Sequence, residues 1–351
     1  MSIAAPDIPA TARLQLSGDA LVANWRALNR FSGAASAGAA VKADAYGLGA
    51  LPVVQKLLDA GCQDFFVANW QEAREIEAIA AGKASISVLN GVREEDMAFA
   101  VKSSAKPVLN SIEQILRWST TSLPCDVMIN SGMNRLGINP GDLGHGCIAN
   151  LDIDLAMSHL ASADEDCKQN TDQLAKYLSA LIDLQYKRSS FANSAGIMLG
   201  TDYHFDVTRP GLSLYGGKPR PELADQIQQV ATPQAQILQV RHVRPGDKIG
   251  YNAKYIADRD LRIAILAMGY ADGYLRGFSN KGCFLADGGK LRVIGRVSMD
   301  LTAIDLTQAP KLEEGDWVDC DYDLPEASRI SGLSQYELIT GLGQRLPRIW
   351  Q

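Results

Sequence analysis

Short apolar runs alternate with amphipathic stretches along the first two thirds of the chain. In the stretch 170–185, Leu174, Tyr177, Leu178 and Leu181 recur at the i, i+3, i+4, i+7 spacing that predicts a helix. Similar helical patterns occupy residues 51–61, 70–82 and 111–119. Between these patterns, runs of strand length occupy residues 37–43, 64–69, 85–90, 106–110, 125–130, 153–159, 190–193 and 205–211.

This order of elements predicts the fold class. Strands that alternate with helices indicate parallel βαβ units. Eight strand candidates favour a closed, TIM-like (β/α)8 barrel, and a doubly wound open sheet is the alternative. Catalytic groups of such barrels lie at the C-terminal ends of the strands. A closed barrel would therefore bring to one opening the polar residues that end these runs, namely Lys42, Asn69, Asn90, Asn130, His159, Asn193 and Arg209.

The pattern changes after Pro233. From there the chain has strand-length apolar runs, turn sequences such as RPGD (244–247) and DGG (287–289), and no long helical pattern. We therefore expect a barrel domain over residues 1–225 and a mostly β domain over residues 226–351. The first 16 or so residues are expected to be able to pair with the second domain.

Composition narrows the functional classes. The 351 residues are 46% apolar and 21% charged, which is typical of a globular protein. A net charge of -6 argues against nucleic acid or an anionic membrane as partner. Six cysteines without a C-x-x-C pair form neither a disulfide framework nor a zinc site, and no metal is expected. The N-terminal residues lack the pattern of a secretory signal, and no run is long enough to span a membrane, so the cytoplasm is the expected location.

One lysine stands in an unusual setting. Lys42 ends an apolar run and is followed by Tyr46 and two glycines, in the stretch AVKADAYGLG. Two interpretations account for this setting: a solvated lysine in a loop, or a nucleophilic amine at the opening of a barrel. The stretch alone does not choose between the two interpretations.

A series of motifs favours the second interpretation, a nucleophilic amine. AVKADAYGLG resembles the cofactor-lysine signature of the alanine racemases, a family built on pyridoxal 5'-phosphate (PLP). The resemblance continues in the family's order over nearly the whole chain. It implies a PLP-binding barrel, a β domain, and a homodimer in which two subunits share each active site. The further matching blocks are GMNRLGI (132–138), SHLASADE (158–165), ANSAG (192–196), RPGLSLYG (209–216), IGYNAKY (249–255), GYADGY (269–274) and GRVSMD (295–300).

The resemblance implies which residues bind the cofactor. Lys42 supplies the amine that links covalently to PLP. Arg209 faces the pyridine nitrogen, and because arginine stays protonated it can only donate there. The ring nitrogen then stays unprotonated, which makes the ring a weaker electron sink and limits side reactions. The phosphate is bound by Tyr46, Ser194 and the backbone of Gly211 and Leu212. The full implied set of PLP-binding residues is Lys42, Tyr46, Arg135, His159, Asn193, Ser194, Arg209, Gly211 and Leu212.

Racemisation needs proton transfer on two faces of the substrate's α-carbon. The resemblance gives one face to Lys42 and the other to Tyr251, which the partner subunit donates. A tyrosine has an ordinary pKa of about 10, so its phenolate needs stabilising neighbours. The resemblance assigns that task in part to His159 and Arg209.

The substrate carboxylate has two implied partners, the side chain of Arg135 and the backbone N–H of Met299. Here the chain departs from many relatives, in which a carbamylated lysine helps to hold this arginine. Met128 and Asn130 stand at the lysine and aspartate positions of the corresponding K-x-D-T-G-M motif. Gln344 stands where many relatives have a phosphate-binding tyrosine.

The predicted function is interconversion of L- and D-alanine by a two-base mechanism, which would supply D-alanine for peptidoglycan. A broader-specificity amino acid racemase is one alternative. A barrel-type PLP-dependent decarboxylase of basic amino acids is another, and the RPGLSLYG and GYADGY blocks and the chain length argue against it. A non-catalytic PLP carrier would resemble only the barrel, so the second domain argues against that class.

Overall fold

The computed structural model describes residues 8–351. The prediction that the N-terminus is not a secretory signal also concerns residues 1–7, which lie outside the described range. The chain forms two compact units. One comprises Gly18–Gln228, and the other joins the described part of Met1–Ser17 to Gln229–Gln351.

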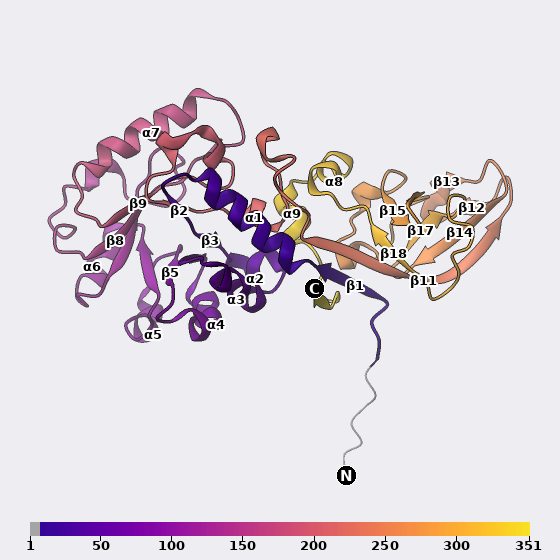
Figure 1. The fold of residues 1–351 in the computed structure, drawn as a ribbon, viewed down its shortest axis with the longest axis horizontal. Coiled ribbons are helices and arrows are strands. Elements are labelled where there is room, and N and C mark those ends of the chain that lie inside the picture. The colour runs from indigo at the N-terminus through magenta and orange to yellow at the C-terminus, as the bar shows by residue number, and fades with distance from the viewer. Residues whose placement is uncertain (1–7) are drawn as a thin grey trace, which may run out of the picture. The chain divides into compact units, whose positions relative to one another are not determined.

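The core of the first unit is a ring of parallel strands (Figure 1). Seven of them form a continuous sheet in chain order: β3 (Ala39–Ala40), β4 (Asp64–Val67), β5 (Ser85–Val88), β6 (Lys106–Leu109), β7 (Cys125–Met128), β8 (Ile153–Met157) and β9 (Arg188–Ser190).

An eighth strand closes the ring. β10 (Val207–Thr208) pairs in parallel with β2 (Ser36–Ala37), which lies one residue before β3. On its other side the N–H of Arg209 donates to the carbonyl of Ala192 at 2.8 Å, and that of Asp206 to Ser189 at 3.1 Å. The fold is therefore the TIM-like barrel that the alternation of strands and helices predicts, and not an open sheet.

Helices cover the outside of the ring (Figure 1). Local signals begin and end several of them. Asn69 and Ser111 accept hydrogen bonds from the first turns of α4 and α6, and α3 ends at Gly61 with a φ of 104°. The helices of this unit are α1 (Gly18–Phe31), α2 (Lys42–Gly47), α3 (Ala50–Ala60), α4 (Trp70–Ala80), α5 (Met97–Ala100), α6 (Ile112–Trp118) and α7 (Lys168–Leu181).

Three details differ from the sequence-based expectation. The run 37–43 is not one strand, because a helical turn begins at Lys42. The runs 190–193 and 205–211 are mostly loops around the short strands β9 and β10. Helix α1, which precedes the first predicted strand, was not among the predicted helices.

The helix predicted from the spacing of Leu174, Tyr177, Leu178 and Leu181 is α7, and only part of this apolar set is buried. Tyr177 and Leu181 are buried, but Leu178 is 49% exposed. Its place on the buried face is taken by polar Gln173, whose amide donates to Ser131 Oγ and to the carbonyl of His159. A hydrophobic pattern does not reveal a polar residue that is buried with hydrogen-bond partners.

The second unit is built on one long strand. β11 (Ala231–Val243) pairs antiparallel with β1 (Ala12–Leu16), β14 (Leu261–Leu266) and β18 (Trp317–Cys320). The remaining strands extend this sheet or form a short hairpin. They are β12 (Lys248–Ile249), β13 (Tyr255–Ile256), β15 (Cys283–Ala286), β16 (Gly289–Arg292), β17 (Thr302–Asp305) and β19 (Arg348–Trp350).

Two short helices, α8 (Leu324–Ser331) and α9 (Gln335–Thr340), lie near the C-terminus of this unit, where no helical pattern was expected. Local chemistry accounts for them. Pro325 lies in the first turn of α8, and Ser334 and Glu337 form a capping box at the start of α9. The unit is mostly, but not wholly, β.

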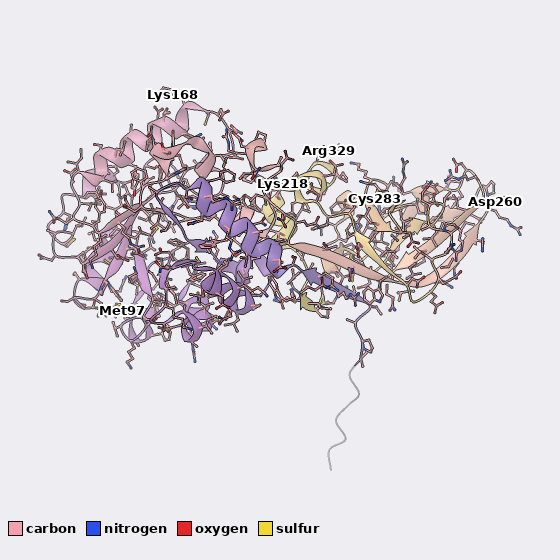
Figure 2. The ribbon with its side chains drawn as sticks, in the orientation of Figure 1. Met97, Lys168, Lys218, Asp260, Cys283 and Arg329 are labelled. Carbon is pink, nitrogen blue, oxygen red and sulfur yellow. The ribbon has the colours of Figure 1, made fainter. Side chains whose placement is uncertain are left out.

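Three further features concern the whole described chain. Within residues 8–351, no helix is both long and apolar enough to cross a membrane. No cluster of three or more potential metal-ligating side chains occurs in the same part of the chain. All six cysteines lie in the described range and are free, among them Cys283 of β15 (Figure 2).

Candidate active site

The predicted site residues of the barrel lie just after the C-terminal ends of its strands. Because the strands are parallel, these ends form one edge of the ring. Lys42 follows β3, Arg135 lies in the loop after β7, and His159 follows β8. After β9 and β10 come Asn193, Ser194, Arg209, Gly211 and Leu212.

Lys42 begins a turn of unusual backbone geometry. The four residues after it, Ala43 to Tyr46, have φ between 52° and 57° and form a left-handed helical turn. This conformation costs roughly 1–2 kcal/mol per non-glycine residue. Surrounding hydrogen bonds hold it, including one of 2.6 Å from the N–H of Ala50 to Asp44 Oδ1. Such concentrated strain is typical of functional sites.

The site carries a concentration of positive charge. Burial lowers the pKa of Lys42, and the charge of Arg135 lowers it further. Burial lowers the pKa of Arg209 to about 10, so its guanidinium stays protonated at neutral pH. We call Lys42, Arg135 and Arg209 the cation cluster. Burial, with the cation cluster adding to it, lowers the pKa of His159 to about 3, so this imidazole is neutral at physiological pH.

Arg209 is held rigidly. One guanidinium nitrogen donates to Ser190 Oγ and another to the carbonyl of Ser158. The guanidinium carbon also lies 5.9 Å from the centre of the Phe66 ring. A buried cation with these partners can present its remaining N–H groups in only one direction, which suits a donor to a ring nitrogen.

Beside Arg209 lies a cradle of small and polar groups. Ser194 Oγ accepts from the N–H of Gly211 at 3.0 Å and from the N–H of Ser213 at 3.2 Å. The Tyr46 ring packs on Tyr215 at 4.8 Å. A Cβ at Gly211 would come within 2.4 Å of Tyr46 Oη, so a side chain there would displace Tyr46. Ser213 Oγ is buried without a hydrogen-bond partner, and such an orphaned donor together with the cradle fits a bound phosphate group.

The loop that carries Arg135 is braced by amides. Asn130 N–H donates to the carbonyl of Ile138 at 2.9 Å, which closes the loop. The Asn130 side chain accepts from the N–H groups of Gly132 and Asn134 and donates to the side chains of Asn134 and Asn139.

Below this loop, Met128 is buried, and a Cβ at Gly137 would lie 3.1 Å from its Cγ. Thus an apolar side chain and an amide network occupy the lysine and aspartate positions of the K-x-D-T-G-M motif. Arg135 itself is exposed and makes no ion pair with another described residue.

Two predicted residues belong to the other unit. Tyr251 begins a 3-10 turn and is 65% exposed, and Met299 is 54% exposed. The carbonyl of Met299 accepts from the N–H of Ala271 at 2.9 Å. Gln344 is exposed as well, and its neighbour Arg345 pairs with Asp272.

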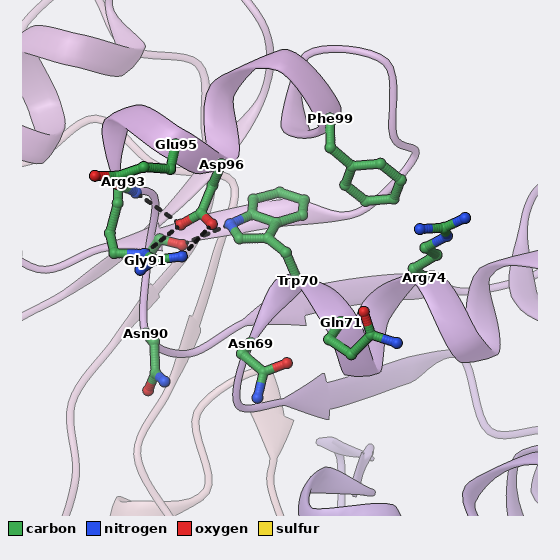
Figure 3. A pocket seen from close by; sticks show the side chains of 10 residues that line it. All are labelled: Asn69, Trp70, Gln71, Arg74, Asn90, Gly91, Arg93, Glu95, Asp96 and Phe99. Carbon is green, nitrogen blue, oxygen red and sulfur yellow. Dashed lines mark hydrogen bonds and ion pairs between the residues drawn. The ribbon is translucent and has the colours of Figure 1, made fainter.

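The strand-end residues Asn69 and Asn90 line a pocket of about 690 Å³ (Figure 3). Trp70 closes one side, where its indole N–H donates to the carbonyl of Gly91 at 2.9 Å. The other lining residues are Gln71, Arg74, Arg93, Glu95, Asp96 and Phe99.

Sequence reasoning missed several residues that support the site. Ser158 and Ser190 hold Arg209, and Tyr215 positions Tyr46. Glu72 accepts from the backbone next to Lys42. For Glu72 a signal existed, because it stands three residues after the helix-capping Asn69. The serines carry no signal of their own in the sequence.

Comparison with known proteins agrees with this geometry. Residues 16–219 match the family described as alanine racemase, N-terminal domain, and residues 230–350 match alanine racemase, C-terminal domain. An alanine racemase of Cereibacter sphaeroides is 38% identical over 346 residues, which cover 97% of this chain and 98% of that protein. A catabolic alanine racemase of Agrobacterium fabrum is 38% identical over 356 residues, covering 97% and 92%.

Solved structures give the same answer. The crystal structure of alanine racemase from Bartonella henselae with covalently bound pyridoxal phosphate superimposes with a TM-score of 0.91 at 34% identity. That likeness covers 98% of this chain and 100% of the other. Sequence blocks, barrel, β domain and these likenesses all agree, and the chain belongs to the alanine racemase family.

Proposed function

We propose that this protein is a PLP-dependent alanine racemase that interconverts L- and D-alanine. The observation that carries the proposal is the cation cluster with its half-buried amine, Lys42, on the same barrel edge as the cradle of Ser194 and Gly211. An amine of lowered pKa is a nucleophile near neutral pH. The cation cluster attracts the phosphate and carboxylate groups that PLP and an amino acid carry.

Each barrel residue of the proposed site has its own role. Bound PLP would withdraw electrons from the α-carbon and so make its proton acidic. Lys42 binds the cofactor and exchanges a proton on one face of that carbon. Arg209 would donate to the ring nitrogen of bound PLP, and its phosphate would be held by Tyr46, Ser194, Gly211 and Leu212, with Asn193 next to Ser194 in the chain. Arg135 orients the substrate carboxylate, and neutral His159 adds no further positive charge to the cluster.

Tyr251 exchanges the proton on the opposite face, and the N–H of Met299 meets the substrate carboxylate. Both residues come from the partner subunit of a homodimer, so each active site is shared. Their high exposure within their own unit supports this, because a tyrosine that catalyses for another subunit must be accessible to it. The enzyme acts in the cytoplasm, where free cysteines persist, and supplies D-alanine for peptidoglycan.

The deciding experiment measures D-amino-acid formation from each L-amino acid by the purified protein with added PLP. We expect alanine to be the best substrate. Reduction of the PLP-loaded protein with borohydride, followed by peptide mapping, should place the pyridoxyl group on Lys42. Comparable rates with many amino acids would favour the broader-specificity racemase, and label on another lysine would overturn the assignment of Lys42.

The shared site has its own test. Lys42→Ala and Tyr251→Phe proteins should each be inactive, and subunit exchange between them should restore part of the activity, because hybrids contain one intact site. The Tyr251→Phe protein alone should still exchange the α-hydrogen of D-alanine with solvent deuterium, since Lys42 serves that face. Equal loss of exchange from both enantiomers would contradict the two-base assignment.

A further inference from the structure

Glu72 connects two segments at the catalytic edge of the barrel. It lies in the first turn of α4, and its two carboxylate oxygens accept different backbone hydrogen bonds. Oε1 accepts from the N–H of Ala43 at 2.9 Å, and Oε2 accepts from the N–H of Ala68 at 2.7 Å. One side chain thus joins the residue directly after Lys42 to the residue directly after β4.

The segment that Glu72 contacts has a strained backbone. Ala43 is the first of the four residues in the left-handed turn, a conformation that alanine and tyrosine rarely adopt. Without an external constraint, the segment after Lys42 would relax toward ordinary backbone angles and carry the lysine with it. Glu72 is itself fixed, because its own N–H donates to Asn69 Oδ1 at 3.0 Å at the start of α4.

Glu72 also acts on the charge of the lysine. Arg135 and burial both favour the neutral amine of Lys42, and the carboxylate of Glu72 opposes them by favouring the ammonium, which raises its pKa. Neighbouring His159 is neutral and adds no charge to this balance. Glu75, one turn further along α4, is exposed and pairs through its side chain with Gln71.

We propose that Glu72 is a positioning residue for Lys42. Its carboxylate holds the left-handed turn that presents the lysine, and its negative charge balances the cation cluster next to the reacting amine. This inference rests on the proposed function for its catalytic meaning, but the turn and the amine can be measured without any racemisation.

Two variants separate the roles of Glu72. Glu72→Gln keeps the shape and one acceptor oxygen but removes the charge, whereas Glu72→Asp keeps the charge but is too short to reach both N–H groups. Glu75→Gln is the matched control on the same helix. For each full-length protein without added PLP, the rate at which acetic anhydride labels Lys42 is followed by peptide mass spectrometry as a function of pH, with exposed Lys168 as internal reference.

We expect the labelling midpoint of Lys42 to fall by roughly half a pH unit or more in Glu72→Gln, because a nearby negative charge is lost. In Glu72→Asp the midpoint should stay closer to that of the unmodified protein. With PLP and alanine, both Glu72 variants should lose about tenfold or more in kcat with little change in KM, since a displaced amine slows proton transfer more than binding. Glu75→Gln should change neither quantity.

The inference is wrong if Glu72→Gln and Glu75→Gln share one labelling midpoint, or if both Glu72 variants turn over alanine as fast as the unmodified protein. If the unmodified protein fails to racemise alanine, the proposed function fails instead. The labelling midpoints would still decide whether Glu72 acts on Lys42.

Discussion

Charged side chains are paired with one another at the N-terminal edge of the barrel, whereas the cation cluster at the C-terminal edge forms no ion pair within the described residues 8–351. At the N-terminal edge, five charged side chains pair with one another inside the ring. Arg188 bonds both Asp64 and Asp154, each at about 3 Å, and Lys106 pairs with Asp126 and Asp154. Asp126, which burial drives toward a raised pKa, also accepts from Ser87 Oγ at 2.6 Å.

At the C-terminal edge, the cation cluster has no such partners. Lys42, Arg135 and Arg209 make no ion pair with any residue in the described range 8–351. Burial of Lys42 and Arg209 without a directly paired counter-ion costs free energy, which the fold has to supply, and the nearby carboxylate of Glu72 offsets only part of that cost. The difference teaches that the paired edge serves stability, whereas the unpaired edge is arranged for anionic groups that arrive with cofactor and substrate.

The same substitution at each edge should therefore have opposite effects. Lys42→Met should lower racemisation by at least the ~10²–10⁴-fold that one acid–base group contributes. Its melting temperature without PLP should not fall, because an unpaired and partly buried cation is removed. Calorimetry and a D-alanine assay on the same preparation check both statements. A clear drop in melting temperature would contradict the claim that the unpaired edge does not serve stability.

Lys106→Met should do the reverse. It leaves buried Asp126 and its neighbour Asp154 without their lysine, and breaking a buried ion pair typically costs about 3–5 kcal/mol. Denaturant unfolding measures this loss, while turnover per folded, PLP-loaded subunit should stay near the unmodified value. The control is Lys168→Met, since exposed Lys168 pairs only on the surface of α7 (Figure 2). Equal unfolding midpoints for the two variants would contradict the structural role of the paired edge.

His159 should make the C-terminal edge sensitive to acid. Folding lowers its pKa from 6.5 to about 3, so below pH 6.5 the unfolded chain binds a proton that the folded chain refuses. Stability that is complete above pH 6.5 should therefore fall by about 2 kcal/mol on going to pH 5. Unfolding of the PLP-free protein at pH 7.5 and 5 measures this, and His159→Gln should remove that share of the loss. The exposed His145→Gln control should retain it.

The smallest expected effect concerns how Arg135 is held. Asn130→Ala removes the amide that joins the loop to Asn134 and Asn139. We expect kcat/KM for alanine to fall about tenfold, mainly through a raised KM, which corresponds to about 1.4 kcal/mol and to one or two hydrogen bonds. Added bicarbonate should not alter the activity of the unmodified protein, because Met128 cannot be carbamylated. Unchanged kinetics of Asn130→Ala would mean that Arg135 is held by other groups.

Much of the fold and the outline of the site could be predicted from the sequence alone. Because the alternation of strand and helix patterns is local, the sequence predicts the barrel. The same patterns place Lys42, His159 and Arg209 at strand ends. Ordered motif blocks identified the family. The change after Pro233 to strand-length apolar runs and turn sequences indicated a second, mostly β unit. Its two short helices, α8 and α9, were not predicted because their capping signals span only a few residues.

The tertiary structure alone decided how the site is supported. The left-handed turn after Lys42, the bridge through Glu72 and the serines behind Arg209 each depend on groups that are distant in sequence. So does the buried face of α7, where the amide of Gln173 donates to Ser131 and to the carbonyl of His159. Periodicity reports which side chains avoid water, but it carries no information about which polar partner a folded chain will bring within 3 Å. For that reason the sequence could propose the reacting residues, whereas it could not predict the groups that support them.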